Sequence, residues 1–233
     1  MAQIGGFTVW LTGMLGAGKT TTANYLAARL RQVGRNVEVL DEEELQDELW
    51  KDIGGDVKEE RQLIGRRLGF VADLLTRNNV CTLVAAVTPY KGVREENRRA
   101  IGRYVEVYVD CPTEKLIARD TTGKYKKALS GEIPNFIGIT EPYEPPGSAE
   151  VVIHSDTEGV EAGAMKVFQA LLDLSFMTAE ELKVITGTKM KPQKLVKKSA
   201  ARHGAKGDRK AARPAARAAR VAKPKAASKR KGR

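Results

Sequence analysis

The residues best suited to chemistry lie at 13–20, where the sequence reads GMLGAGKT. Its glycines, lysine and threonine fit G-x-x-x-x-G-K-[ST], the pattern of a phosphate-binding loop. Gly13, Gly16 and Gly18 allow a tight turn that points backbone N–H groups at phosphate oxygens. In such a loop Lys19 reaches the β- and γ-phosphates of ATP, and the Thr20 hydroxyl is a ligand of Mg²⁺.

The segments on either side of this loop are the ones that the motif requires. Residues 7–12 are apolar and β-branched, which is typical of a buried strand. Residues 21–33 carry apolar side chains at helical spacing. The N-terminus of that helix adds partial positive charge, so the predicted ATP site also includes Ala17 and Thr21.

A second candidate follows the next predicted strand, residues 36–40, and is Asp41. An acid at the carboxyl end of a parallel strand lies where α/β sheets bind ligands. We therefore expect Asp41 either to orient Mg²⁺ or to accept a proton from a substrate hydroxyl. We interpret Glu42 and Glu44 as acids that suit the dipole at the N-terminus of the following helix.

The remaining elements predict an α/β fold in which strands alternate with helices. Further strands are expected at residues 80–87, 104–109 and 151–153, and further helices at 59–77, 94–101, 113–119 and 158–174. This order is typical of a doubly wound parallel sheet of the P-loop NTPase type.

Residues 120–146 break the pattern because they are rich in glycine, proline and lysine. So long a stretch with little core is more often a lid or binding loop than a plain connection. The alternative is an ordinary solvated loop in which Phe136 is a satellite core residue.

The net charge of +11 is unevenly distributed along the 233 residues. Residues 191–233 hold 17 lysines and arginines against one acid, which leaves the rest of the chain at about −5. We predict a P-loop domain over 1–176, a short helical extension over 177–188 and a disordered basic tail over 189–233. Thr-Ala-Glu-Glu at 178–181 fits a capping box that opens the helix of the extension. The tail is either a solvated extension that meets polyanions weakly or a non-specific binder of nucleic acid.

The two cysteines, Cys81 and Cys111, fit no metal motif and form no disulfide framework. We interpret them as buried thiols in a reducing compartment. Neither a signal peptide nor an apolar run long enough to span a membrane is evident. The expected location is the cytoplasm, with no membrane partner.

The predicted lid and its neighbouring strand resemble the adenylylsulfate kinase (APS kinase) family, over roughly residues 5–175. The segments that carry the resemblance are YVEVYVD at 104–110, ARDTTGKYKKA at 118–128, GEI at 131–133, NFIGI at 135–139 and PYE at 142–144. Thr-Pro-Tyr at 88–90 resembles the family's Ser-Pro-Tyr, and Arg94 and Arg98 fall where the family has arginines.

The resemblance implies a reaction in which ATP, with Mg²⁺, phosphorylates the 3′-hydroxyl of adenosine 5′-phosphosulfate (APS). It implies catalytic roles for Lys19, Asp41 and Thr88, with Thr20 and Asp41 on the metal. Thr88 would be a positioning hydroxyl in a direct in-line transfer. Arg119 would serve the lid and the ATP side. A homodimer is also expected.

The resemblance also implies a set of residues that contact the acceptor nucleotide. Within this set Phe136 would stack on the adenine and Lys126 would meet phosphate or sulfate. The full expected set is Asp41, Arg61, Pro89, Tyr90, Lys126, Phe136 and Ile139.

The chain departs from the family on the acceptor side. Where the family reads Asp-Gly-Asp-Asn-x-Arg, residues 41–46 read DEEELQ, so Gln46 replaces the arginine. In the next helix Ile64 replaces an asparagine of the family. A site that loses hydrogen-bonding partners loses selectivity for a polar substrate.

The sequence therefore leaves three functions open. The first is APS kinase, and the second is a kinase of the same fold for a different nucleotide or small hydroxyl acceptor. The third is a non-catalytic nucleotide-binding module that acts through its basic tail.

Overall fold

The computed structural model describes residues 5–51, 53 and 57–187. Five strands form one parallel sheet in the order β2-β3-β1-β4-β5. They are β1 (Phe7–Thr12), β2 (Val37–Asp41), β3 (Cys81–Ala85), β4 (Tyr104–Asp110) and β5 (Val151–His154). The predicted α/β fold is confirmed. The predicted tail, 189–233, lies outside the described residues.

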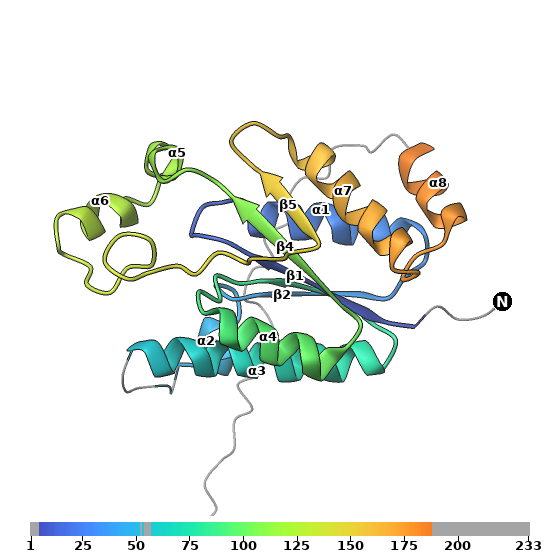
Figure 1. The fold of residues 1–233 in the computed structure, drawn as a ribbon, viewed down its shortest axis with the longest axis horizontal. Helices are drawn as coiled ribbons and strands as arrows, with labels where there is room; N and C mark the ends of the chain where they lie inside the picture. Colours follow the sequence, from blue (N-terminus) through green and yellow to red (C-terminus); the bar gives the residue numbers. More distant parts are fainter. Residues whose placement is uncertain (1–4, 52, 54–56, 188–233) are drawn as a thin grey trace, which may run out of the picture. The chain divides into compact units, whose positions relative to one another are not determined.

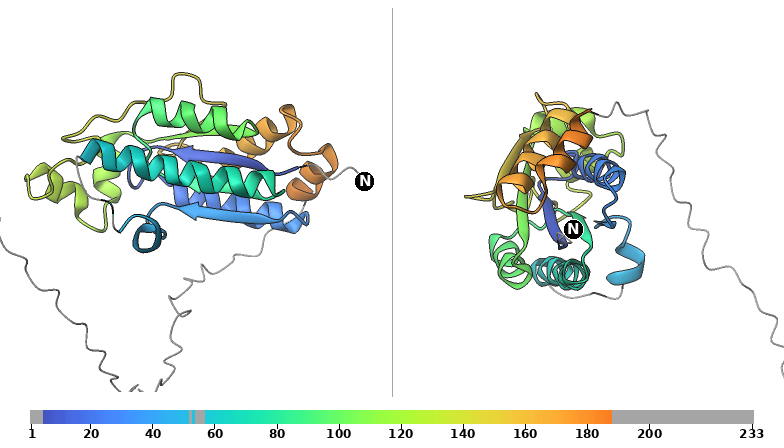
Figure 2. Two further views of the ribbon diagram at one scale, coloured as in Figure 1. Left: turned by 90° about the horizontal axis from the view of Figure 1, so that it is seen from below. Right: turned by 90° about the vertical axis from the view of Figure 1, so that its right-hand side faces the viewer.

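Helices cover both faces of the sheet (Figure 1). Two views agree that α3 and α4 lie on one face and that α1 and α7 lie on the other, with α8 beside them (Figure 2). The helices are α1 (Lys19–Gln32), α2 (Gln46–Leu49), α3 (Val57–Arg77), α4 (Lys91–Ile101), α5 (Thr113–Arg119), α6 (Lys124–Leu129), α7 (Val160–Asp173) and α8 (Ala179–Gly187). Among the described residues, no helix has both the length and the apolar character to span a bilayer.

Strand β1 is buried on both faces because it lies in the middle of the sheet. Val9 and Leu11 belong to the core cluster that includes Phe168 of α7. Trp10 points the other way, into the cluster that includes Leu68 of α3. Successive side chains of a strand face opposite sides, which explains why this apolar run does not alternate with polar residues.

The register of the parallel strands brings three loops to one edge of the sheet. Ala85 of β3 pairs with Leu11 of β1 on one side and with Asp41 of β2 on the other. The phosphate loop, the segment after Asp41 and the segment after Ala85 therefore leave the sheet together. Strand order also reverses beside β1, and such a switch point is where open α/β sheets bind ligands.

Helices α3 and α4 pack closely through a glycine. A Cβ added to Gly69 would lie 2.0 Å from Oδ1 of Asn97, so a larger residue would displace the Asn97 side chain. Asn97 also donates a hydrogen bond of 3.0 Å to the Gly65 carbonyl. This packing fixes the part of α3 that carries Arg61 and Ile64.

The predicted lid contains a helix that the sequence did not indicate. Helix α6 buries Tyr125 and Ala128, whereas the rest of its surface is exposed. Six residues with two apolar contacts are too short for a periodic signal.

The end of the described chain is anchored by α8. The capping box predicted at its start is confirmed, because Glu181 N–H donates to the Thr178 hydroxyl (3.1 Å) and Thr178 N–H donates to Glu181 (2.8 Å). Glu181 also pairs with Arg35 at 2.6 Å. Partial burial works to raise the pKa of Glu181, but the hydrogen bond from Arg35 holds it below its ordinary value.

Candidate active site

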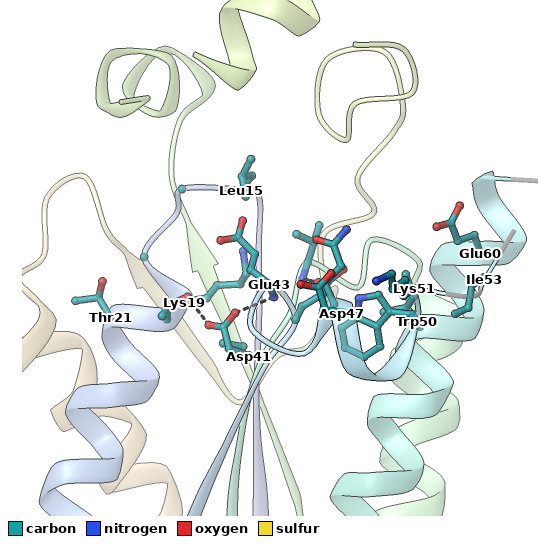
Figure 3. A pocket seen from close by; sticks show the side chains of 18 residues that line it. Leu15, Lys19, Thr21, Asp41, Glu43, Asp47, Trp50, Lys51, Ile53 and Glu60 are labelled. Carbon is teal, nitrogen blue, oxygen red and sulfur yellow. Dashed lines mark hydrogen bonds between the residues drawn. The ribbon is translucent and has the colours of Figure 1, made fainter. Parts of the chain in front are cut away.

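A cavity of about 590 Å³ opens beside the phosphate loop, and we call it the loop cavity. Figure 3 shows Lys19 and Thr21 on the α1 side, Trp50 and Lys51 on the opposite side, and Asp41 between them. Of the residues predicted to bind ATP, those that line the loop cavity are Gly16, Gly18, Lys19, Thr20 and Thr21. Asp41, the predicted Mg²⁺ ligand, lines it as well. Gly13 and Ala17 are buried behind this surface.

The phosphate loop depends on a glycine at its first position. Gly13 has φ +147°, and a Cβ there would lie 2.3 Å from the Val109 carbonyl oxygen of β4. The adjacent strand therefore leaves no room for a side chain. This close approach fixes where the loop begins.

Lys19 lies folded against its own loop. Its Nζ donates hydrogen bonds to the carbonyl oxygens of Gly13 (3.0 Å) and Met14 (2.9 Å). Burial lowers the pKa of Lys19, and the charges of Glu42 and Asp41 oppose that shift. The ammonium group is influenced by three acids, Glu42, Asp41 and Glu43, and it is placed to move onto a bound anion.

Thr20 and Asp41 bring two oxygen ligands together on the floor of the loop cavity. The Thr20 hydroxyl donates to Oδ2 of Asp41 at 2.6 Å, and Glu43 N–H donates to Oδ1 at 2.9 Å. Magnesium is usually held by one or two protein oxygens together with phosphate and water. The pair fits a Mg²⁺ site, and the described residues contain no group of three acidic, histidine or cysteine ligands.

A second cavity of about 250 Å³ lies between α3 and the predicted lid, and we call it the lid cavity. The residues predicted to contact the acceptor that line it are Arg61, Pro89 and Phe136, together with Thr88. Arg61 donates one hydrogen bond to the Asn135 carbonyl of the lid. Its other terminal nitrogen, Nη1, is buried without a partner among the described residues, as is the Thr88 hydroxyl.

Thr88 is held in a rare backbone conformation at the end of the segment after β3. Its φ of +36° is unusual for a β-branched residue and signals local strain. Arg94, itself buried, donates to the Thr88 carbonyl (2.7 Å) and to the Glu144 carbonyl (2.6 Å), and it pairs with Glu106 (2.8 Å). Arg94 therefore fixes Thr88 relative to the lid and β4.

Phe136 connects the lid to the phosphate loop. Its ring meets the Tyr125 ring edge-on, with centroids 4.9 Å apart, and the Tyr125 hydroxyl donates to the Leu15 carbonyl at 2.7 Å. Phe136 packs against the core and also lines the lid cavity. Phe136 is therefore a satellite core residue that also forms part of the wall of the lid cavity, and its stacking on the adenine stays a prediction.

Four predicted residues lie apart from these two cavities. Tyr90 is buried at the start of α4, and Lys126 is exposed on α6. Ile139 lines a third hollow with Met14. Arg119 donates to the Ser155 carbonyl at 2.8 Å. Their roles toward ATP or the acceptor stay predictions.

Glu42 was misinterpreted from the sequence. The next helix, α2, begins only at Gln46, so Glu42 does not decorate a helix N-terminus. Its carboxylate instead accepts a 2.7 Å hydrogen bond from Val87 N–H and lines both cavities. Burial raises the pKa of Glu42, while the Val87 hydrogen bond and Lys19 oppose that shift. The only feature of the sequence that distinguished Glu42 is that the APS kinase motif has glycine at this position.

Comparison with known proteins identifies relatives over most of the chain. The family model described as adenylylsulphate kinase matches residues 5–154. The adenylyl-sulfate kinases of Rippkaea orientalis and of a Picosynechococcus strain are 46% and 44% identical to the chain, covering 74% of it in each case and 94% and 97% of the relative.

A solved structure shows the same fold. The APS kinase of Mycobacterium tuberculosis, in complex with AMPPNP and APS, is 32% identical with a TM-score of 0.67, over 71% of this chain and 97% of that one.

Proposed function

The chain belongs to the adenylylsulphate kinase family, and we propose that it phosphorylates the 3′-hydroxyl of APS with ATP. The hydroxyl oxygen forms a bond to the γ-phosphorus while the bond from that phosphorus to the β-phosphate oxygen breaks. ADP leaves with that bonding pair, the hydroxyl proton passes to solvent, and the product is 3′-phosphoadenosine 5′-phosphosulfate. A role in sulfate assimilation follows from this product.

The observation that carries the proposal is the pair of adjoining cavities. The loop cavity and the lid cavity share the side chains of Leu15, Glu42, Ile64 and Val87. A phosphoryl donor in one and an acceptor in the other would therefore meet across a common wall. Holding two reactants in this way supplies much of the catalysis of phosphoryl transfer.

On the ATP side, we propose that Lys19 exchanges the Gly13 and Met14 carbonyls for phosphate oxygens. Its two hydrogen bonds show that the ammonium group reaches the inner surface of the loop. Thr20 and Asp41 would hold Mg²⁺, which neutralises phosphate charge when bound. Arg119, on the exposed end of α5, would contact ATP from the lid side.

On the acceptor side, the unpaired donors of the lid cavity support an anionic, polar substrate. Arg61 Nη1 and the Thr88 hydroxyl are buried and lack partners among the described residues, and leaving such groups unpaired costs free energy. A ligand that pairs them recovers that cost. Phe136 would stack on the adenine, and Tyr90, Lys126 and Ile139 would complete the contacts with the acceptor.

A second candidate is transfer to a different hydroxyl compound. The observation that favours it is Ile64, whose apolar side chain lies in the wall between the cavities. Gln46 lines the loop cavity without a charge. These two residues would tolerate an acceptor that is less polar than APS where it contacts this wall. The cytoplasmic location and a homodimer stay predictions.

The proposed function is tested by single-turnover reactions of the full chain with γ-labelled ATP. APS and a panel of other nucleotides and small hydroxyl compounds serve as acceptors. We expect labelled 3′-phosphoadenosine 5′-phosphosulfate as the main product. Faster labelling of another acceptor would establish the second candidate instead. If no ATP is turned over with any acceptor, only the non-catalytic module is left.

A further inference from the structure

The carboxylate of Glu42 occupies the wall shared by the loop cavity and the lid cavity. The side chain is largely buried, and one of its oxygens, Oε2, is fixed by the 2.7 Å hydrogen bond from Val87 N–H. No hydrogen bond reaches its other oxygen, Oε1, from elsewhere in the described part of the chain. A residue that lines both cavities thus carries a carboxylate oxygen that no described residue uses.

Asp41, the acid that the sequence favoured, lies in a different position. It lines the loop cavity and is not part of the lid cavity. Its two oxygens already accept hydrogen bonds from the Thr20 hydroxyl and from Glu43 N–H. Asp41 is therefore committed to the ATP and Mg²⁺ side and is poorly placed to contact an acceptor.

We propose that Glu42 contacts the reacting hydroxyl of the acceptor and orients it toward the γ-phosphoryl group. The proposal rests on the proposed phosphoryl transfer, because only that reaction requires a hydroxyl at the shared wall. Free Oε1 accepts a hydrogen bond from the hydroxyl, which leaves the hydroxyl lone pairs directed at the phosphorus. Correct orientation of a reacting pair is worth large factors in rate.

The charge of Glu42 is balanced within the same site. Lys19 and Glu42 influence each other's charge, as the opposing effects on their pKa values show. A lone carboxylate facing a triphosphate would repel it, whereas a neighbouring ammonium reduces that repulsion. Glu42 can therefore remain beside the transferred group without excluding ATP.

The decisive variant is Glu42→Gln in the full chain. Val87 N–H needs an acceptor, so it holds the amide oxygen and leaves the NH₂ group at the position of Oε1. That group donates and cannot accept the hydroxyl's hydrogen bond. We expect kcat for the acceptor to fall about 10- to 100-fold, with the Kd for ATP and the Tm unchanged.

Two further variants separate contact with the hydroxyl from a structural role. Glu42→Ala removes the Val87 contact as well, so it lowers both kcat and Tm. Glu44→Gln is the matched control, because Glu44 is exposed on the same segment and lines neither cavity. A merely structural Glu42 would give wild-type kcat in Glu42→Gln and loss only in Glu42→Ala, and that result overturns the inference.

The wild-type protein distinguishes failure of the inference from failure of the proposed function. If APS is inert but another hydroxyl compound is phosphorylated, the proposed substrate is wrong and the Glu42 variants are assayed with that compound. If APS is phosphorylated and Glu42→Gln matches the wild type, only the inference fails. If the wild-type protein phosphorylates no acceptor, both the proposed function and the inference about Glu42 are wrong.

Discussion

Replacing Arg61 with methionine tests the guanidinium group of a residue that lines the lid cavity. Arg61 Nη2 is used by the Asn135 carbonyl, whereas Nη1 is buried without a partner among the described residues. Methionine keeps much of the aliphatic volume and removes the charge and all the N–H donors of the guanidinium group. The side chain lines the lid cavity but not the loop cavity, so the effect should fall on the acceptor alone.

The expected change in the Kd for APS follows from the loss of one hydrogen bond from a charged donor. Such a bond contributes about 1.5–3 kcal/mol, which corresponds to about a 10- to 150-fold weaker Kd for APS. Loss of the Asn135 contact adds to this by loosening the lid. Arg61→Lys keeps the charge but can reach only one of the two positions, so its loss should be intermediate.

The assay is calorimetric titration of APS into protein saturated with a non-hydrolysable ATP analogue. Arg66→Met is the matched control, because Arg66 lies on the same helix, is exposed and pairs with Glu96 at 2.8 Å. The Kd of the analogue is measured in parallel and should stay within about twofold. A Kd for APS that changes less than threefold in Arg61→Met, or equally in Arg66→Met, refutes the reasoning.

Four shorter predictions concern other parts of the protein. Lys19→Ala should reduce phosphoryl transfer by at least about 100-fold with an unchanged Tm; activity within tenfold of the wild type contradicts the assignment. Phe136→Ala should weaken APS binding by about 1–3 kcal/mol but not ATP binding in parallel titrations, with Phe136→Leu as the control that keeps lid packing. Gln46→Arg combined with Ile64→Asn should raise kcat/KM for APS, and an unchanged or lower value would show that these positions do not set selectivity. The pKa of Glu181 is depressed in the folded protein, so its stabilisation is present above its unfolded pKa of about 4.3 and is lost as pH falls through the folded value. Glu181→Gln should therefore flatten the fall of unfolding free energy between about pH 5 and 3, measured by urea denaturation, and a slope equal to that of the wild type would count against the Arg35 ion pair.

The phosphate loop illustrates what local sequence can specify. Its glycines, lysine and threonine act through backbone geometry over eight residues, and the flanking strand and helix have strong local patterns. The sequence therefore predicted the loop, the order of strands and helices, and the parallel sheet. The capping box at Thr178 was predicted for the same reason, because both partners lie within one helical turn.

Helix α6 and the position of Glu42 show what local sequence could not specify. Helix α6 is short and stabilised by contacts of Tyr125 with the distant phosphate loop. Glu42 belongs to an acidic run whose members look equivalent along the chain. Only its distant partner, Val87 N–H, distinguishes it from exposed Glu43 and Glu44.

The sequence by itself determined the α/β class, the phosphate-binding chemistry and, through its lid motifs, the resemblance to APS kinases. The tertiary structure decided which predicted residues share a cavity: it joined Arg61, Thr88 and Phe136 in the lid cavity and left Lys126 on the surface. The physical reason is that these contacts depend on strand register and on the packing of α3 against α4. Both are set by residues far apart in the chain, and no local pattern encodes them.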